Sequence, residues 1–327
     1  MTGDPVTFDD VRAARARIEG KLRKTPVLTS TTLDRLFGAS LRLKCENFQR
    51  AGVFKSRGAF NTVFTLGDAD AQRGVVTSSS GNHAAAISLA ARTRGIRAYI
   101  AMPKNALKSK VAAVHRYGGE IIWVESRGEV PTTEEYDATV ARVQAETRAN
   151  LVHPYNDPRV IAGQGTCAAE FLEECPDLDF LLAPVGGGGL LSGTTLAARG
   201  ARSAVKVIGC EPEAADDAQR SLRAGHIVPQ IGPRTIADGL RTSLGDLTFA
   251  LISRDVEDIV TVTEQGIAEA MRLAYEVLKI VIEPSSAVPL AALLERKLAV
   301  EGRKVGVILT GGNADLDQLP WARPAER

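Results

Sequence analysis

Short apolar runs rich in β-branched residues alternate with longer stretches of helical pattern along most of this 327-residue chain. Turn-forming residues flank the short runs, which favours strands over short helices. Alternating strands and helices are typical of parallel sheets joined by crossover helices. We therefore predict an α/β fold of parallel-sheet lobes with flanking helices. The predicted strands are Leu41–Cys45, Gly74–Thr77, Ala98–Met102, Glu120–Val124, Phe180–Val185, Lys206–Cys210, Ile259–Val262 and Lys304–Leu309, and the predicted helices include Asn82–Thr93, Thr139–Arg148, Gly163–Glu174, Thr263–Lys279 and Ser286–Glu301.

The domain organisation follows from the same alternation. Residues 74–154 contain a complete β-α-β-α-β-α pattern of their own. We expect this segment to form a small lobe inserted into a larger domain, which residues 1–73 and 155–327 build together. The sequence stops soon after the last predicted strand, so no additional C-terminal domain is expected.

Charge and apolar content exclude several classes of partner. The formal net charge is +1 with both signs interleaved, so no electrostatic field favours nucleic acid. No apolar run approaches the roughly 20 residues that span a bilayer, and the N-terminus has no signal-peptide core. We interpret the cysteines, which show no C-x-x-C pairing, as reduced thiols of a cytoplasmic protein with small-molecule partners. They are Cys45, Cys167, Cys175 and Cys210.

Three predicted strands end in glycine or small polar residues, after Val76, Val185 and Leu309. Ligands of open parallel sheets bind at the carboxyl ends of strands, so these junctions could face one crevice. The second junction, Gly186-Gly-Gly-Gly-Leu-Leu-Ser-Gly193, opens a predicted helix. Its backbone N–H groups and the helix dipole can bind a phosphate. The alternative is a tight turn, which needs only one or two glycines.

The remaining candidate sites are weaker when taken singly. Ser78-Ser-Ser-Gly-Asn-His83 suits a carboxylate-sized anion, or it is simply an N-cap. Thr310 could hydrogen-bond a heterocyclic nitrogen, or it belongs to a turn. Lys55 stands between a turn glycine and a predicted helix, where a desolvated lysine could form a Schiff base, although most lysines are solvated surface charges. The acidic loop Glu211–Asp217 could bind Mg²⁺ or Ca²⁺, or it is a solvated loop.

Together these motifs resemble the fold-type II pyridoxal-phosphate enzymes, specifically the serine/threonine dehydratase and serine racemase family. The resemblance covers nearly the whole chain. The matching motifs are Thr25-Pro-Val-Leu28, Lys44-Cys-Glu-Asn47, Gly52-Val-Phe-Lys-Ser-Arg-Gly-Ala59, Ser79-Ser-Gly-Asn-His83, Ala162-Gly-Gln-Gly-Thr166, Gly186-Gly-Gly-Gly189, Thr235-Ile-Ala-Asp-Gly239, Glu283-Pro-Ser-Ser-Ala287 and Thr310-Gly-Gly-Asn313.

The resemblance implies a two-domain fold similar to the tryptophan synthase β subunit. Residues 1–73 and 155–327 would form the large domain that binds pyridoxal 5′-phosphate, and residues 74–154 a small, mobile substrate domain. It also implies a homodimer. Lys55 would form the Schiff base, and Phe54 would lie against the cofactor ring. The other implied cofactor contacts are Asn82, Gly186, Gly187, Gly188, Gly189, Leu190, Gly239, Glu283 and Thr310, and the substrate carboxylate would contact Ser79, Ser80, Gly81, Asn82 and His83.

The implied function is an ammonia-lyase that converts a small β-hydroxy amino acid, with L-serine and L-threonine foremost, into a 2-oxo acid and ammonia. Ser80 would be an acid on the face of the substrate opposite Lys55, which would permit serine racemase activity. Glu211, the Ala215 carbonyl and Asp217 match a divalent-cation site (Mg²⁺, Ca²⁺ or Mn²⁺) of racemase-like members.

Other functions remain as alternatives. A hydroxyaspartate dehydratase would need a cation for the second carboxylate, and Arg127 in the segment 126–136 is either that cation or a surface arginine. A cofactor-binding protein without catalysis would be expected to lack the lysine or the glycine loop. A β-replacement enzyme typically has threonine where this chain has His83.

Overall fold

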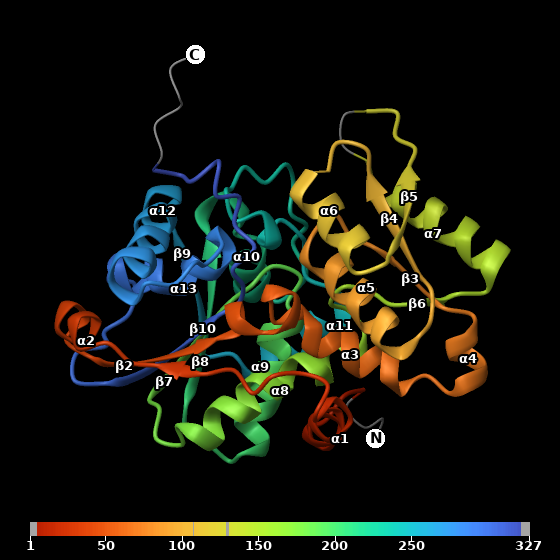
Figure 1. Ribbon diagram of the computed structural model, residues 1–327. Helices are drawn as coiled ribbons and strands as arrows, with labels where there is room; N and C mark the ends of the chain where they lie inside the picture. Colours follow the sequence, from red (N-terminus) through yellow and green to blue (C-terminus); the bar gives the residue numbers. More distant parts are fainter. Residues whose placement is uncertain (1–4, 107, 129–130, 322–327) are drawn as a thin grey trace.

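The computed structural model describes residues 5–106, 108–128 and 131–321, which form two β-sheets with helices around them (Figure 1). The larger sheet has six strands in the order β1-β2-β10-β7-β8-β9. Neighbouring strands are parallel, except that β1 runs antiparallel to β2. The bounds are Val27–Leu28 for β1, Ser40–Cys45 for β2, Phe180–Pro184 for β7, Lys206–Pro212 for β8, Asp258–Val262 for β9 and Lys304–Leu309 for β10.

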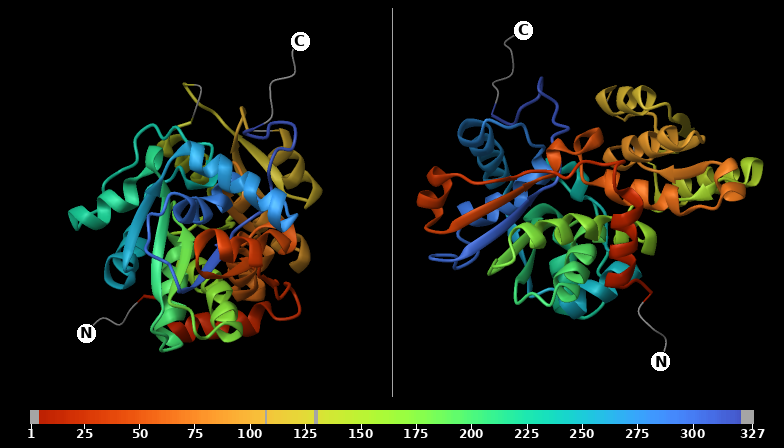
Figure 2. Two further views of the ribbon diagram at one scale, coloured as in Figure 1. Left: turned by 90° about the vertical axis from the view of Figure 1, so that its left-hand side faces the viewer. Right: turned by 60° about the horizontal axis from the view of Figure 1, so that its bottom comes forward.

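The smaller sheet is fully parallel and has the strand order β5-β4-β3-β6. It forms a lobe beside the larger sheet, orange to yellow-green in Figures 1 and 2. All of its strands come from the 74–154 segment, and the predicted parallel α/β architecture is confirmed. The division into a cofactor domain and a mobile substrate domain stays a prediction. The strand bounds are Val75–Ser78 for β3, Ala98–Pro103 for β4, Glu120–Val124 for β5 and Asn150–Leu151 for β6.

Helices bury both faces of the larger sheet. In β10, Val305, Val307 and Leu309 pack on the side of α12 and α13, whereas Ile308 packs on the side of α8 and α9. This alternation is the period of two that a strand imposes, and burial on both faces is typical of parallel sheets. The helix bounds are Phe8–Ile18 (α1), Thr31–Phe37 (α2), Lys55–Thr65 (α3), Asp68–Gln72 (α4), Asn82–Arg94 (α5), Lys108–Arg116 (α6), Thr133–Thr147 (α7), Pro158–Glu174 (α8), Gly189–Gly200 (α9), Asp217–Ala224 (α10), Asp246–Asp255 (α11), Glu264–Leu273 (α12) and Pro284–Leu294 (α13).

Most differences from the predicted elements lie at helix ends. A capping box of Thr132 and Glu135 starts α7 earlier than predicted. The predicted helix 286–301 was wrong at its C-terminal end, because α13 ends at Leu294. Glu295 Oε1 instead accepts hydrogen bonds from the backbone nitrogen (3.0 Å) and the hydroxyl (2.6 Å) of Thr263. The next residue, Arg296, adopts a φ of 53°, which takes the chain out of the helix.

Charged side chains form a buried cluster that joins β2, α3 and α8. Arg57 Nε and one terminal nitrogen each lie 2.8 Å from a different Glu46 oxygen, and its other terminal nitrogen lies 2.9 Å from Glu170. Lys44 Nζ lies 2.7 Å from the second Glu170 oxygen. None of these side chains is more than 9% exposed. Two positive charges match two negative ones, so the cluster buries no net charge.

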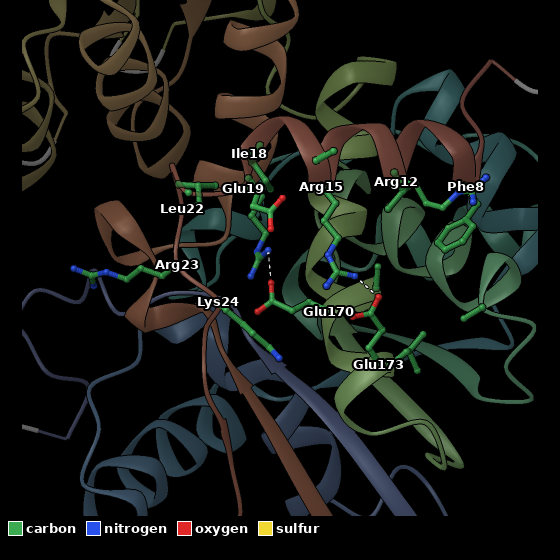
Figure 3. Close-up of a pocket in the computed structure, with 17 residues that line it drawn as sticks. Phe8, Arg12, Arg15, Ile18, Glu19, Leu22, Arg23, Lys24, Glu170 and Glu173 are labelled. Atoms are coloured by element: carbon green, nitrogen blue, oxygen red, sulfur yellow. Dashed lines mark hydrogen bonds and ion pairs between the residues drawn. The ribbon is translucent and has the colours of Figure 1, made fainter.

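A cavity of about 700 Å³ lies between α1 and α8, and Arg57 and Glu170 form part of its wall (Figure 3). Arg15 on α1 and Glu173 on α8 form an ion pair across it. None of the candidate cofactor or substrate residues of the sequence analysis lines this cavity. The candidate active site therefore lies elsewhere.

Two further features bear on the class of protein. Within the part of the chain that the structure describes, no helix is both long and apolar enough to cross a membrane. Cys45, Cys167, Cys175 and Cys210 are free and buried, as predicted. The cytoplasmic location and the homodimer stay predictions.

Candidate active site

A second cavity, of about 590 Å³, opens where strands of both sheets end. The segments that follow β3, β6, β7 and β10 form part of its wall. This is where ligands bind in parallel α/β folds. All the residues predicted to contact cofactor or substrate line it, namely Phe54, Lys55, Ser79, Ser80, Gly81, Asn82, His83, Gly186, Gly187, Gly188, Gly189, Leu190, Gly239, Glu283 and Thr310.

Lys55 is the first residue of α3, and a short antiparallel pairing fixes its position. Phe54 N donates to Thr310 O at 2.9 Å, and Gly312 N donates to Gly52 O at 2.9 Å. These bonds attach the lysine loop, residues 52–54, to the end of β10, which is an interior strand of the larger sheet. Lys55 Nζ donates to the Pro154 carbonyl at 2.8 Å, and burial lowers the pKa of its amine to about 8. An amine with that pKa is partly neutral near pH 7, as a Schiff-base nucleophile requires.

The four glycines after β7 are each crowded on their side-chain side. A Cβ on Gly186 would lie 2.9 Å from Leu240, and one on Gly187 would lie 2.4 Å from the ring of Tyr155. A Cβ on Gly188 or Gly189 would also meet neighbouring atoms within 3.1 Å. Only Gly188, with a φ of +86°, requires the left-handed region. Close packing, more than turn geometry, therefore explains the run, and it fits a loop that offers backbone N–H groups to a phosphate.

Asn82 connects the serine-rich loop to the opposite wall. Its amide nitrogen donates to both Glu283 oxygens, at 2.8 and 2.9 Å, and its oxygen accepts from Asn313 at 2.8 Å. Burial raises the pKa of Glu283 to about 7, although the Asn82 bond opposes this. The predicted cofactor residues Asn82 and Glu283 therefore bind each other at the base of the site.

His83 and Thr310 are candidate residues with buried polar side chains. His83 is buried, and neither ring nitrogen makes a hydrogen bond of good geometry with a described residue, although the Val152 backbone is near enough to oppose the fall in its pKa. Burial, reinforced by the nearby charge of Lys55, holds the pKa of His83 well below its usual value, so the ring is neutral. Thr310 is 2% exposed and lines the same cavity. Both groups suit a buried ligand with complementary polar atoms.

The cavity wall contains residues that the sequence analysis missed. Lys110 on α6 forms an ion pair with Asp238, and its Nζ would lie 3.3 Å from a Cβ on Gly81. His153 and Tyr155 follow β6, with ring centroids 4.6 Å apart. Since β6 has only two residues, its strand pattern was too short to recognise. A polar cluster after that strand was the signal that could have identified these side chains.

Glu211, Ala215 and Asp217 lie apart from this cavity and line no part of it. Glu211 accepts from the backbone nitrogens of Ala218 (3.0 Å) and Gln219 (2.8 Å). Burial, followed by the charge of Asp217, raises the pKa of Glu211 well above its usual value. Asp217 Oδ1 is buried without a hydrogen-bond partner, and no group of three or more His, Cys, Asp or Glu side chains among the described residues is placed to hold a metal.

Arg127 is exposed and does not line the cavity. Its backbone nitrogen donates to Glu135 at 2.9 Å. In this structure Arg127 is therefore a surface arginine, which was the second of the two alternatives. Residues 129 and 130 of the same segment lie outside the described residues.

The family model described as "Pyridoxal-phosphate dependent enzyme" matches residues 18–311 of the chain. The chain belongs to this family. It is 51% identical to the beta-hydroxyaspartate dehydratase of Paracoccus denitrificans (strain Pd 1222), over 96% of this chain and 98% of that protein. It is 48% identical to a serine racemase of Oryza sativa subsp. indica, over 97% and 94% of the two chains. The solved structure of maize serine racemase superposes with a TM-score of 0.92 at 45% identity and covers 95% of both chains.

These likenesses confirm the fold-type II assignment to the serine/threonine dehydratase and serine racemase family. The site also fits pyridoxal phosphate on its own terms. A partly neutral lysine is available for the aldehyde, a crowded glycine loop opens α9 for the phosphate, and the buried Thr310 side chain lines the same cavity. Which individual residues contact the cofactor and the substrate stays a prediction.

The glycine loop gives the first testable prediction. Gly187→Ala would force the loop or Tyr155 to move, because a Cβ cannot lie 2.4 Å from a ring carbon. We expect binding of pyridoxal phosphate to the apoprotein to weaken at least about tenfold, which corresponds to about 1.4 kcal/mol. Fluorescence titration measures this. The control is Gly67→Ala, since a Cβ there meets nothing within 4 Å. Equal affinities of the two variants for pyridoxal phosphate would contradict a role of the glycine loop in phosphate binding.

Proposed function

We propose that this protein is a pyridoxal-phosphate-dependent ammonia-lyase that converts a small β-hydroxy amino acid, with L-serine and L-threonine foremost, into a 2-oxo acid and ammonia. The observation that carries the proposal is the position of Lys55. Its amine, with a pKa near 8, lies in the same cavity as a loop suited to a carboxylate and a loop suited to a phosphate. Proteins named serine racemase and hydroxyaspartate dehydratase are its relatives.

The chain's own residues divide the reaction between them. Bound pyridoxal phosphate supplies the electron sink for negative charge at the substrate Cα. The residues Ser79–His83 hold the substrate carboxylate at the N-terminal end of α5, which favours an anion. Lys55 Nζ, once displaced by the substrate amine, takes the Cα proton as a positioned base. The β-hydroxyl then leaves, and hydrolysis of the unsaturated product releases ammonia and the 2-oxo acid.

We also propose that Ser80 is the acid that protonates Cα on the face of the substrate opposite Lys55. It lines the cavity and is exposed to it. With both groups in place the site can reprotonate Cα on either side, which amounts to racemisation. Without Ser80 only elimination should remain.

A substrate panel tests the proposed function. L- and D-serine, L-threonine and 3-hydroxyaspartate are each scored for 2-oxo acid and for exchange between enantiomers. We expect 2-oxo acid from at least one β-hydroxy substrate, and none from Lys55→Ala, which should also lack visible Schiff-base absorption. Ser80→Ala should lose enantiomer exchange and keep some elimination. Turnover by Lys55→Ala would refute the assignment of the base.

A hydroxyaspartate dehydratase is the second candidate, and Lys110 favours it. A substrate with two carboxylates needs a cation beyond the carboxylate-binding loop. Lys110 lies beside Gly81 of that loop and is the only Lys or Arg side chain, apart from Lys55, among the described residues that line the cavity. Its present partner, Asp238, could be exchanged for the substrate. Asp137 on the same wall would oppose a second negative charge.

Lys110→Met separates the two candidates. If Lys110 binds the distal carboxylate, kcat/KM for 3-hydroxyaspartate should fall by about 10- to 100-fold, since a hydrogen bond to a charged group contributes roughly 1.5–3 kcal/mol. The value for L-serine should change little. Lys108→Met is the matched control, because Lys108 lies on the same helix, is exposed and does not line the cavity. A parallel loss with both substrates would argue for a structural role.

We also propose a divalent cation at Glu211, Asp217 and the Ala215 carbonyl. Two buried carboxylates and a carbonyl are ligands that Mg²⁺ and Ca²⁺ prefer. The unpartnered Asp217 Oδ1 and the raised pKa of Glu211 support the site, because a cation would offset both.

Chelation should therefore lower the melting temperature by a few degrees, as expected when a ligand bound only to the folded state is removed. Asp217→Asn should abolish this difference. Glu213→Gln, which changes an exposed carboxylate in the same loop, should preserve it. Identical melting curves with Mg²⁺ and with a chelator in the unmodified protein would exclude the site.

A further inference from the structure

His153 is a cavity residue that the reaction described above does not use. It follows β6 and comes immediately before Pro154, whose carbonyl accepts the hydrogen bond from Lys55 Nζ at 2.8 Å. His153 also lines the cavity. A side chain in this position lies beside the group that must reach the substrate Cα.

Backbone hydrogen bonds determine which ring nitrogen of His153 carries the proton. His153 Nδ1 accepts from Asn156 N at 2.9 Å and from Tyr155 N at 3.3 Å. A backbone N–H can only donate, so Nδ1 must be the unprotonated nitrogen of the ring. In the neutral ring the proton therefore resides on Nε2.

The surroundings of His153 favour the neutral form of its ring. Burial lowers the pKa of His153, and the charge of Lys55 lowers it further, although Asp157, Asp137 and Asp246 oppose the shift. Tyr155 contacts the ring edge-on at 4.6 Å and restricts its rotation. With Nδ1 bound to the backbone and the ring lining the cavity, Nε2–H is the donor that His153 can offer to a ligand.

We propose that His153 is a substrate-binding residue whose Nε2–H donates a hydrogen bond to the β-oxygen of the substrate. Lys55 must contact the Cα hydrogen, and the β-carbon is one bond away, so a donor beside Lys55 is suitably placed for the oxygen on that carbon. The carboxylate-binding loop and Lys55 define two points of the substrate, and His153 adds the third. This inference rests on the proposed ammonia-lyase function.

The proposed role is binding and orientation, and the ring keeps its proton. Hydroxide is a poor leaving group, and a hydrogen bond to it stabilises the charge that develops on oxygen as the C–O bond breaks. Chloride leaves with its electron pair and needs no such donor. Selectivity for β-hydroxy over β-chloro substrates should therefore depend on His153.

Two substitutions separate this role from a purely structural one. His153→Asn can place its amide oxygen near the position of Nδ1, which keeps the acceptor for the backbone of Asn156 but leaves no donor that reaches the substrate. His153→Gln can place its amide N–H near the position of Nε2, which keeps the donor but removes the turn acceptor. The test compares both variants on β-chloro-L-alanine and on the best β-hydroxy amino acid of the panel.

We expect His153→Asn to lower kcat/KM for the β-hydroxy substrate at least about tenfold relative to β-chloroalanine, with an unchanged melting temperature. His153→Gln should retain most of the wild-type ratio while melting at a lower temperature. An unchanged ratio in His153→Asn, or an equal loss with both substrates, would overturn the assignment. A wild-type protein inactive on both substrates would instead refute the proposed function, and this inference with it.

Discussion

The position of Lys55 depends on a cluster of charges that the fold buries next to it. Arg57, two residues further along α3, binds Glu46 and Glu170, and Glu170 also binds Lys44. Removing one partner of such a buried pair typically lowers the free energy of unfolding by about 3–5 kcal/mol, because the remaining charge is buried without a partner. The start of α3 is therefore held against β2 and α8 by buried ion pairs that share the partners Arg57 and Glu170. If Lys55 is the base, as proposed, that rigidity would help it to reach one hydrogen atom of the substrate.

A second restraint acts on the other side of Lys55. The backbone of residues 52–54 pairs with residues 310–312, so the lysine loop continues the order of the larger sheet beyond β10. These two restraints fix the backbone on both sides of the Lys55 side chain, whose amine donates to the Pro154 carbonyl. Its low pKa follows from the same placement, since burial penalises the ammonium form. The burial of Lys55 within the fold therefore also lowers the pKa of its amine.

The sequence predicted the parts of the molecule whose signals are local. Strands with buried, β-branched residues, such as β10, were recognisable, and so was the glycine loop, because each of its residues packs too closely for a side chain. What could not be predicted depends on contacts between distant segments. Lys110 pairs with Asp238 across the cavity, and His153 follows a strand of two residues. The predicted C-terminal end of the helix 286–301 was wrong for the same reason. Glu295 binds Thr263, and no local sequence pattern indicates that contact.

The two sheets supply different groups to the cavity. Lys55, the glycine loop and Thr310 come from segments attached to the larger sheet, whereas the residues Ser79–His83, Lys110 and His153 come from the smaller one. Most groups predicted to contact the cofactor are therefore attached to the larger sheet, whereas Asn82, predicted to contact both cofactor and substrate, comes from the smaller one. Substitutions among the residues from the smaller sheet could alter which β-substituent is bound without disturbing the charge cluster or the glycine loop. On the proposed roles, residues that distinguish one β-hydroxy substrate from another would lie mainly between residues 75 and 155.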